Sequence, residues 1–529
     1  MKMTRQTLVQ CRDDHVGSVR SLISAGVTLW AASLLPCGLA RGQEPPYRLD
    51  QLQQQIVAQE QRILQLEAQV DEQRRVTRRL PDGQEEQGGS QTGEASIESR
   101  LDRLEQSLPD LEEIEGDFLE TLSTVSRRIV NGRVHIDQWS FPQDSPGINV
   151  IETGDPASGP QDRLLYRRIR FGVRGTVPPE NMSYRVEIEF SGQDGSQFRD
   201  AWIGWDDLVL FDTLRLGNQK RPYGLDHLNS SNFNVFLERP FVVDGFNEDN
   251  RRFGLVSYGV SEDLAFNWRY GVYDLTPVQN VGSIINDEFQ LELAWRLANT
   301  WWYDKASGGR GYGHWGLAGT FAFPDGNAPN NGRQNNEARF RTRPEGRSSN
   351  RWLDTRPIAG AEAYQLLGIE SVFNFGRFQF AGEFMNLWLQ RGDESGSDIY
   401  LHGGYFYLSY FLTGEHIPWN RELGILGRVE PFEDFFCVRP RNHRIARGLG
   451  AWQVAARLSY ADFNDEDIFG GIGQSATLAL NWYWNAHARM QFNYVLGRTD
   501  DRVADLAGGG TAIVSGDYQI SGVRFMMDF

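Results

Sequence analysis

Arginine side chains recur at alternating positions in several segments of this 529-residue chain. In residues 164–176, Arg168, Arg170 and Arg174 alternate with apolar residues, and Arg185 continues the pattern in residues 182–191. A guanidinium group stays cationic at any relevant pH and presents a planar fork of donors that matches oxyanions. Spread along a wall, such groups can hold anions weakly and repeatedly, as conduction through a pore requires.

The arginines on these polar faces form a larger set, which we expect to line a lumen. The set is Arg168, Arg170, Arg174, Arg185, Arg215, Arg269, Arg296 and Arg457. The carboxylates Glu187, Glu189, Glu292 and Glu383 share the same faces. The arginines could therefore serve only to solvate the lumen and pair with these acids. We favour an anion preference for the channel.

Other kinds of chemistry have little support in the sequence. It contains no nucleophile elbow, no His-Glu-x-x-His motif, no phosphate-cradling loop and no paired cysteines for a metal. Three of the eight histidines, His402, His416 and His443, fall in separate predicted strands or loops. We therefore expect no enzyme activity, no catalytic residue, no metal site and no cofactor.

The elements that carry these side chains are strands, because the apolar period is two from Ile129 to the end. In the final stretch, Val523, Phe525 and Met527 face one way, while Arg524 and Asp528 face the other. About 9–11 tilted residues are enough to cross a bilayer. Sixteen such strands are expected near 130–139, 164–176, 182–191, 199–208, 212–219, 252–260, 263–273, 288–297, 313–323, 361–374, 377–389, 399–413, 449–461, 473–484, 487–498 and 517–529.

The connections between these strands are of two kinds. Those around 261–262, 374–376 and 484–486 are short, whereas 220–251, 324–360 and 414–448 are long and polar. Short turns on one rim and long loops on the other are typical of an outer-membrane barrel with an even number of strands. We therefore predict an all-β fold, a 16-stranded antiparallel transmembrane β-barrel over 129–529. A barrel this wide is expected to enclose a water-filled lumen.

The residues before the barrel have a different pattern. Residues 1–40 resemble a secretory signal peptide, with basic residues before an apolar run and small residues at a cleavage site. Leu49, Ile56, Ile63 and Val70 recur every seven residues and predict a coiled-coil stalk over 43–80. A linker at 81–96 and a second helical segment at 97–125 follow. The stalk could mediate oligomerisation, or its helix could pack on its own protein.

Composition limits the partners. With 53 basic and 70 acidic residues, the formal net charge is −17, which argues against bulk binding of nucleic acid. Beyond the leader, no apolar run reaches the roughly 18 residues of a spanning helix. Cys437 is the only cysteine after the leader, so no internal disulfide can form in the exported chain.

Residues 214–240 resemble the phosphate-selective porin O/P family, in which a strand ends in Gly-x-x-Lys-x-Pro-Phe-Gly-Leu-Glu, followed by a Ser-Ser and a Glu-Arg pair. Here the stretch runs from Gly217 through Lys220 and Pro222 to Glu238 and Arg239, with Tyr-Gly-Leu-Asp in place of Phe-Gly-Leu-Glu. Further matches at 132–137, 405–415 and 481–494 keep their order along the chain.

The resemblance implies a trimeric outer-membrane porin that passes phosphate-like anions. It also implies a long loop that folds into the pore and narrows it, which here corresponds to 220–251. The cations of this constriction segment are Lys220, Arg221, Arg239, Arg251 and Arg252. Acidic residues of the same segment, Asp226, Asp244, Glu248 and Asp249, dilute its positive charge.

We therefore expect a passive diffusion channel for small anions, phosphate or related oxyanions, in the outer membrane. Its partners would be membrane lipid, the permeating anions and two further copies of the chain. The N-terminal segment would lie in the periplasm, where the stalk could contact the cell wall. The alternative is a structural barrel that anchors the stalk to the cell envelope, with general non-selective diffusion.

Overall fold

The structure is a computed structural model, and it describes residues 128–177, 181–192, 195–247, 251–278, 289–326, 336–392, 394–435 and 448–529. The predicted signal peptide (1–40), stalk (43–80), linker (81–96) and second helical segment (97–125) lie outside the described residues. Cys437 and His443 also lie outside them. The described residues form the barrel wall and the connections between its strands.

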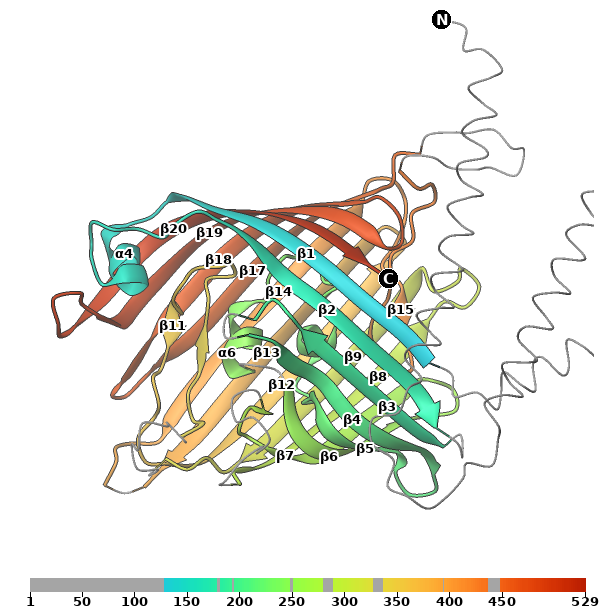
Figure 1. The fold of residues 1–529 in the computed structure, drawn as a ribbon, viewed down its shortest axis with the longest axis horizontal. Helices are drawn as coiled ribbons and strands as arrows, with labels where there is room; N and C mark the ends of the chain where they lie inside the picture. The colour runs from blue at the N-terminus through green and yellow to red at the C-terminus, as the bar shows by residue number, and fades with distance from the viewer. Residues whose placement is uncertain are drawn as a thin grey trace, which may run out of the picture. The chain divides into compact units, whose positions relative to one another are not determined.

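Sixteen strands form one closed sheet, in which each strand pairs with its two neighbours in antiparallel register (Figure 1). They are β1 (Arg128–Gln143), β2 (Arg163–Val177), β3 (Met182–Glu189), β4 (Gln197–Leu208), β5 (Asp212–Lys220), β6 (Arg251–Val260), β7 (Phe266–Asp274), β8 (Leu291–Tyr303), β9 (Gly311–Ala322), β12 (Ala361–Phe375), β13 (Phe378–Arg391), β14 (Ile399–Phe411), β17 (Ala451–Asp465), β18 (Ile468–Tyr483), β19 (Ala488–Asp505) and β20 (Thr511–Asp528). The predicted strand number and antiparallel order are confirmed.

Pairing between β1 and β20 closes the ring, with Arg133 opposite Asp528 and Trp139 opposite Gly522. Closure leaves no sheet edge, so ladder bonds can satisfy the backbone polar groups of the wall within the hydrocarbon layer. No helix of the described part is long and apolar enough to cross a membrane.

Side chains alternate across the wall as the sequence pattern predicts. On β20, Phe525 and Met527 are exposed on the outer face, while Arg524, Met526 and Asp528 are buried inside. One bulge breaks the rule on β2, opposite His135 and Ile136. A bulge adds one residue to a strand, so the consecutive residues Arg167 and Arg168 both lie on the inner side.

Successive connections alternate between the two ends of the barrel. We call one end the turn rim; it carries the connections 209–211, 376–377 and 484–487, together with the end of β20. The other end, the loop rim, carries 144–162, 221–250 and 323–360. The loop-rim connections include the helices α4 (Pro146–Thr153), α5 (Leu225–Leu228) and α6 (Phe241–Phe246), and the two-residue strands β10 (Arg341–Thr342) and β11 (Leu353–Asp354).

One long connection is on the unexpected side. We predicted that 414–448 would share a rim with 220–251 and 324–360, and this is wrong. Because β14 is the twelfth strand of the ring, the chain leaves it at the turn rim. This connection contains the two-residue strands β15 (Trp419–Asn420) and β16 (Ile425–Leu426), which pair only with each other.

The interior is much less open than strand number alone suggested. Segments of the long connections fold inside, where α6 packs against β14 and β17 and its Phe246 stacks on Phe463 at 5.4 Å between ring centroids. From β8 through β20, inward side chains are buried along most of the wall, for example Arg296, Tyr312, Met385, Leu401, Gln453, Asn481, Gln491 and Arg524. Strand number fixes the width of the barrel but not what its connections place inside it.

The assignment of the outer face can be tested with one charge. Ile369 lies near the middle of β12 and is 54% exposed on that face. Ile369→Arg should lower the free energy of unfolding by roughly 2–4 kcal/mol, the usual cost of an arginine at the bilayer midplane. Ile513→Arg, near the loop-rim end of β20, is the control and should cost about 1 kcal/mol or less. Urea unfolding in vesicles measures both; equal costs would contradict the assignment.

Candidate functional site: the arginine-lined lumen

The connection 221–247 crosses the interior, where wall side chains hold its backbone. Arg524 donates to Leu237 O at 2.6 Å, Arg489 donates to Asn234 O at 2.8 Å, and Asn481 donates to Val235 O at 2.9 Å. Each donor projects inward from β18, β19 or β20. Since a buried carbonyl without a partner is costly, these bonds keep irregular backbone stable inside the barrel.

Two polar side chains hold the two ends of α5 by hydrogen bonds to its backbone. Lys220 donates to the carbonyl oxygens of His227, Leu228 and Asn229, each at 2.9 Å, at the end of the helix. Glu383 accepts from the amides of Leu225 at 2.9 Å and Asp226 at 2.7 Å, at its start. The motif lysine therefore supports the inserted segment through its backbone.

The other cations predicted for the constriction also have protein partners. Arg221 pairs with Glu292 at 3.1 Å, Arg239 with Asp226 at 3.1 Å and Arg251 with Asp200 at 3.0 Å, while Arg252 donates to Leu275 O. Burial lowers the pKa of Arg221, but Glu292 together with Tyr223 and Tyr364 raises it further, and the pKa lies above the ordinary arginine value. Of these pairs, only that of Arg221 joins the segment to the wall; the pair of Arg239 lies within the segment, and Arg251 and Arg252 bind from β6 to β4 and to the residue after β7.

Several of the predicted lining arginines are buried in the same way. Arg170 bonds Glu189 at 2.6 Å, and Arg457 bonds Glu345 at 2.6 Å. Arg296 pairs with Glu370, and Arg269 donates to Leu423 O at 2.8 Å. Arg168 lies 3.4 Å from His135 Nδ1.

Three predicted lining residues, Arg174, Arg185 and Arg215, keep more contact with solvent. Arg174 is exposed near the turn rim, and the side chain of Arg185 is 26% exposed. Arg215 lies between two rings, with its guanidinium carbon 4.4 Å from the centroids of both Trp202 and Tyr258. The accessible inward arginines of the predicted set thus gather on β2, β3 and β5, which we call the arginine wall.

The carboxylates next to the arginine wall are buried from solvent in ion pairs. Glu187 is 1% exposed and lies within 3.3 Å of Arg133, Arg170 and Arg185. Asp200 pairs with both Arg185 and Arg251. Glu187 and Asp200 are therefore buried and paired with arginines, while part of the positive charge of the arginine wall still faces the lumen.

Two arginines that bind buried carboxylates in the lumen were absent from the predicted set. Arg524 binds both carboxylate oxygens of Asp137 at 2.7 Å and also Glu238 at 2.8 Å, and Arg167 binds Glu238 at 2.7 Å. The alternation in the last strand could have identified Arg524. The bulge hid Arg167, because strict alternation would have placed it outside.

The two predicted histidines that the structure describes, His402 and His416, lie apart. His402 stacks on Tyr400 from the outer face of β14, at 5.2 Å between centroids, whereas His416 lies in the turn-rim connection. Within the described ranges, no group of three or more His, Cys, Asp or Glu could hold a metal ion.

A closed barrel with segments folded into an arginine-rich lumen is the geometry that the sequence resemblance implied. The model of the phosphate-selective porin O and P family matches residues 151–529. The chain belongs to this family. The resemblance is confirmed, and with the closed barrel it identifies an outer-membrane channel rather than an enzyme.

Individual relatives of this porin are distant. A protein of Caulobacter vibrioides, described as an uncharacterized protein, is 26% identical over 384 residues, which is 69% of this chain and 68% of the relative. Among solved structures, OmpT of Vibrio cholerae in its trimer form has 11% identity and a TM-score of 0.43, over 76% of this chain and 99% of that one. The channel DcaP of Acinetobacter baumannii has 9% identity and a TM-score of 0.43, over 76% and 97%.

The anchoring role of Arg221 makes a stability prediction. Arg221→Ala leaves Glu292 buried without its cation and should cost about 3–5 kcal/mol. The double variant Arg221→Met with Glu292→Gln should recover most of that loss, because no charge then remains unpaired. Urea unfolding is the measurement. Arg356→Ala, which breaks an exposed pair with Asp505, is the control at about 1 kcal/mol or less; a similar loss for Arg221→Ala would contradict the anchoring role.

Proposed function

We propose that this porin is a passive diffusion channel for small anions, phosphate or related oxyanions, and that they pass along the arginine wall. The observation that carries the proposal is the difference in exposure between the two signs of charge. Arg174, Arg185 and Arg215 remain accessible, whereas Glu187 and Asp200 are buried in ion pairs.

The chemistry of the arginine wall suits transient binding. Arg215 stacks its flat face on Trp202 and Tyr258, and such stacking positions the guanidinium without neutralising its charge. Arg185 shares its donors with Glu187 and Asp200, which weakens its hold on any further anion. Weak, successive sites let an anion enter and also leave, so flux follows the concentration gradient.

The proposal predicts the effect of removing this charge. Arg185→Gln with Arg215→Gln should lower the anion-to-cation permeability ratio by roughly twofold per charge, since a unit charge about 8 Å away in water contributes ~0.5 kcal/mol. Reversal potentials in asymmetric chloride measure the ratio, and phosphate titration of the current tests for oxyanion binding. Arg498→Gln removes an equal charge from the outer face near the loop rim and is the control. A cation-selective parent channel that phosphate does not block would reject the proposal.

We also propose that the chain forms a homotrimer through the stalk at 43–80, which lies in the periplasm where it could contact the cell wall. The heptad spacing of Leu49, Ile56, Ile63 and Val70 supports this.

Deleting 43–125 should weaken trimer formation and leave single-channel conductance unchanged, because permeation takes place inside the barrel. Native mass spectrometry and bilayer recordings of the two forms measure the two effects. A trimer that survives the deletion would remove the role given to the stalk, and a changed conductance would remove the separation of stalk and channel.

A further inference from the structure

The connection between β14 and β17 enters the lumen from the turn rim, opposite to the segment 221–247. Its residues 417–424 contact side chains of the wall strands β7, β8 and β9. Ile417 O accepts from Tyr312 at 2.9 Å, Trp419 Nε1 donates to Thr300 at 2.9 Å, and Leu423 O and Gly424 O accept from Arg269 at 2.8 Å and Arg296 at 2.9 Å.

The hairpin reaches the segment that enters from the loop rim. The amide of Leu426 donates to Asn229 Oδ1 at 3.0 Å. Asn229 also supplies one of the carbonyls held by Lys220. Two connections that start at opposite ends of the barrel therefore meet inside it.

The hairpin is bound less firmly than a strand of the wall. β15 and β16 pair only with each other, and their sheet is separate from the ring. Withdrawal of the hairpin would therefore break no ladder bond of the barrel. Arg296 would keep its pair with Glu370, whereas Arg269 would lose the carbonyl of Leu423.

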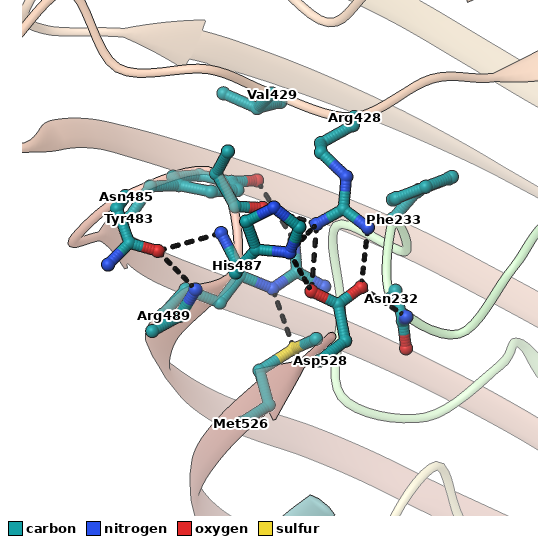
Figure 2. A pocket seen from close by; sticks show the side chains of 12 residues that line it. Asn232, Phe233, Arg428, Val429, Tyr483, Asn485, His487, Arg489, Met526 and Asp528 are labelled. Carbon is teal, nitrogen blue, oxygen red and sulfur yellow. Dashed lines mark hydrogen bonds and ion pairs between the residues drawn. The ribbon is translucent and has the colours of Figure 1, made fainter. Parts of the chain in front are cut away.

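A polar cluster at the turn rim, the latch, holds the base of this connection (Figure 2). Arg428 binds both oxygens of Asp528, at 2.8 and 2.7 Å, and its guanidinium lies 5.4 Å from the ring centroid of Phe233. His487 and Asn232 approach the same carboxylate at 3.2 and 2.5 Å. Asp528 thus joins the last strand, a rim turn and both inserted segments (Figure 2).

We propose that residues 415–428, between the two ends of this connection that bond to the wall, form a displaceable plug, which the latch between Arg428 and Asp528 keeps inside the barrel. Release of the latch moves the equilibrium toward a state with the hairpin withdrawn. That state has a wider lumen and exposes Arg269 as an additional cation. The anion-preference part of this inference rests on the proposed function, whereas the change in width does not.

Release can be tested with the full chain in planar bilayers. Arg428→Ala should raise the occupancy of a larger-conductance state roughly tenfold, the scale expected for loss of a part-buried ion pair. Conductance in that state should exceed the resting value by about twofold or more, because a hairpin leaves the lumen. Arg498→Ala removes an arginine that pairs with Asp500 and Asp517 near the loop rim, and should leave the recordings unchanged. Unchanged recordings for Arg428→Ala would overturn the plug.

A disulfide lock gives a second, independent test. A Cβ built on Gly424 would lie 3.2 Å from Asn267 Cγ, so cysteines at 424 and 267 are close enough to bridge. The two cysteines are introduced into a Cys437→Ser background that also carries Arg428→Ala. The disulfide between them should restore the small conductance, and its reduction should bring back the large conductance. Counting free thiols verifies the bridge. A large conductance that persists with the bridge formed would overturn the proposal.

Selectivity separates this inference from the proposed function. Adding Arg269→Gln to Arg428→Ala should remove the gain in anion preference and keep the gain in conductance. If the parent channel is not anion-selective but Arg428→Ala still widens it, the proposed function fails and the plug stands. If the parent is anion-selective and neither the latch nor the lock changes conductance, the plug fails and the proposed function stands.

Discussion

The structure depends on closure of the sheet by β1 and β20. Because this pairing gives the last strand a neighbour, the backbone groups of the ring are paired within the ring and do not depend on the interior for their hydrogen bonds. The connections that fold inside are therefore held by side chains. This separation allows a closed wall to surround contents whose position depends on polar contacts and apolar packing with inward side chains.

Arginine has two roles in the lumen, and location separates them. Where an inserted segment lies close, as at Arg524, Arg457 and Arg221, the guanidinium donates to a carbonyl or a carboxylate and is buried. Where none covers it, as at Arg185 and Arg215, part of the cation remains available to solute. The same side chain thus shapes the passage and lines it, and burial decides which role a given arginine has.

The strands could be predicted because period-two alternation is local, as in the last strand, where Phe525 and Arg524 face opposite sides. The rim of each connection could also have been predicted by counting strands, because successive antiparallel strands end at alternate rims. Twelve strands precede the connection 412–450, and an even number places it at the same rim as the short turns. The bulge that turns both Arg167 and Arg168 inward has no comparable signal in the sequence.

Pairing across the lumen is not local either. Arg221 and Glu292 are 71 residues apart, and only the folded path of 221–247 brings them together. For this reason the family motif indicated Lys220, while its bonds to three backbone carbonyls could not be foreseen.

The central claim is that the permeating anion passes along the arginine wall and not along the packed side of the lumen. Cysteine substitution followed by a charged thiol reagent, applied during bilayer recording in a Cys437→Ser background, tests it most directly. Cysteines in place of Arg174, Arg185 and Arg215 should react and change the current at once. Cysteines in place of the inward, buried Ala455 and Ala479 should not react. Rapid block at 455 and 479, with no effect at 185 and 215, would contradict the account.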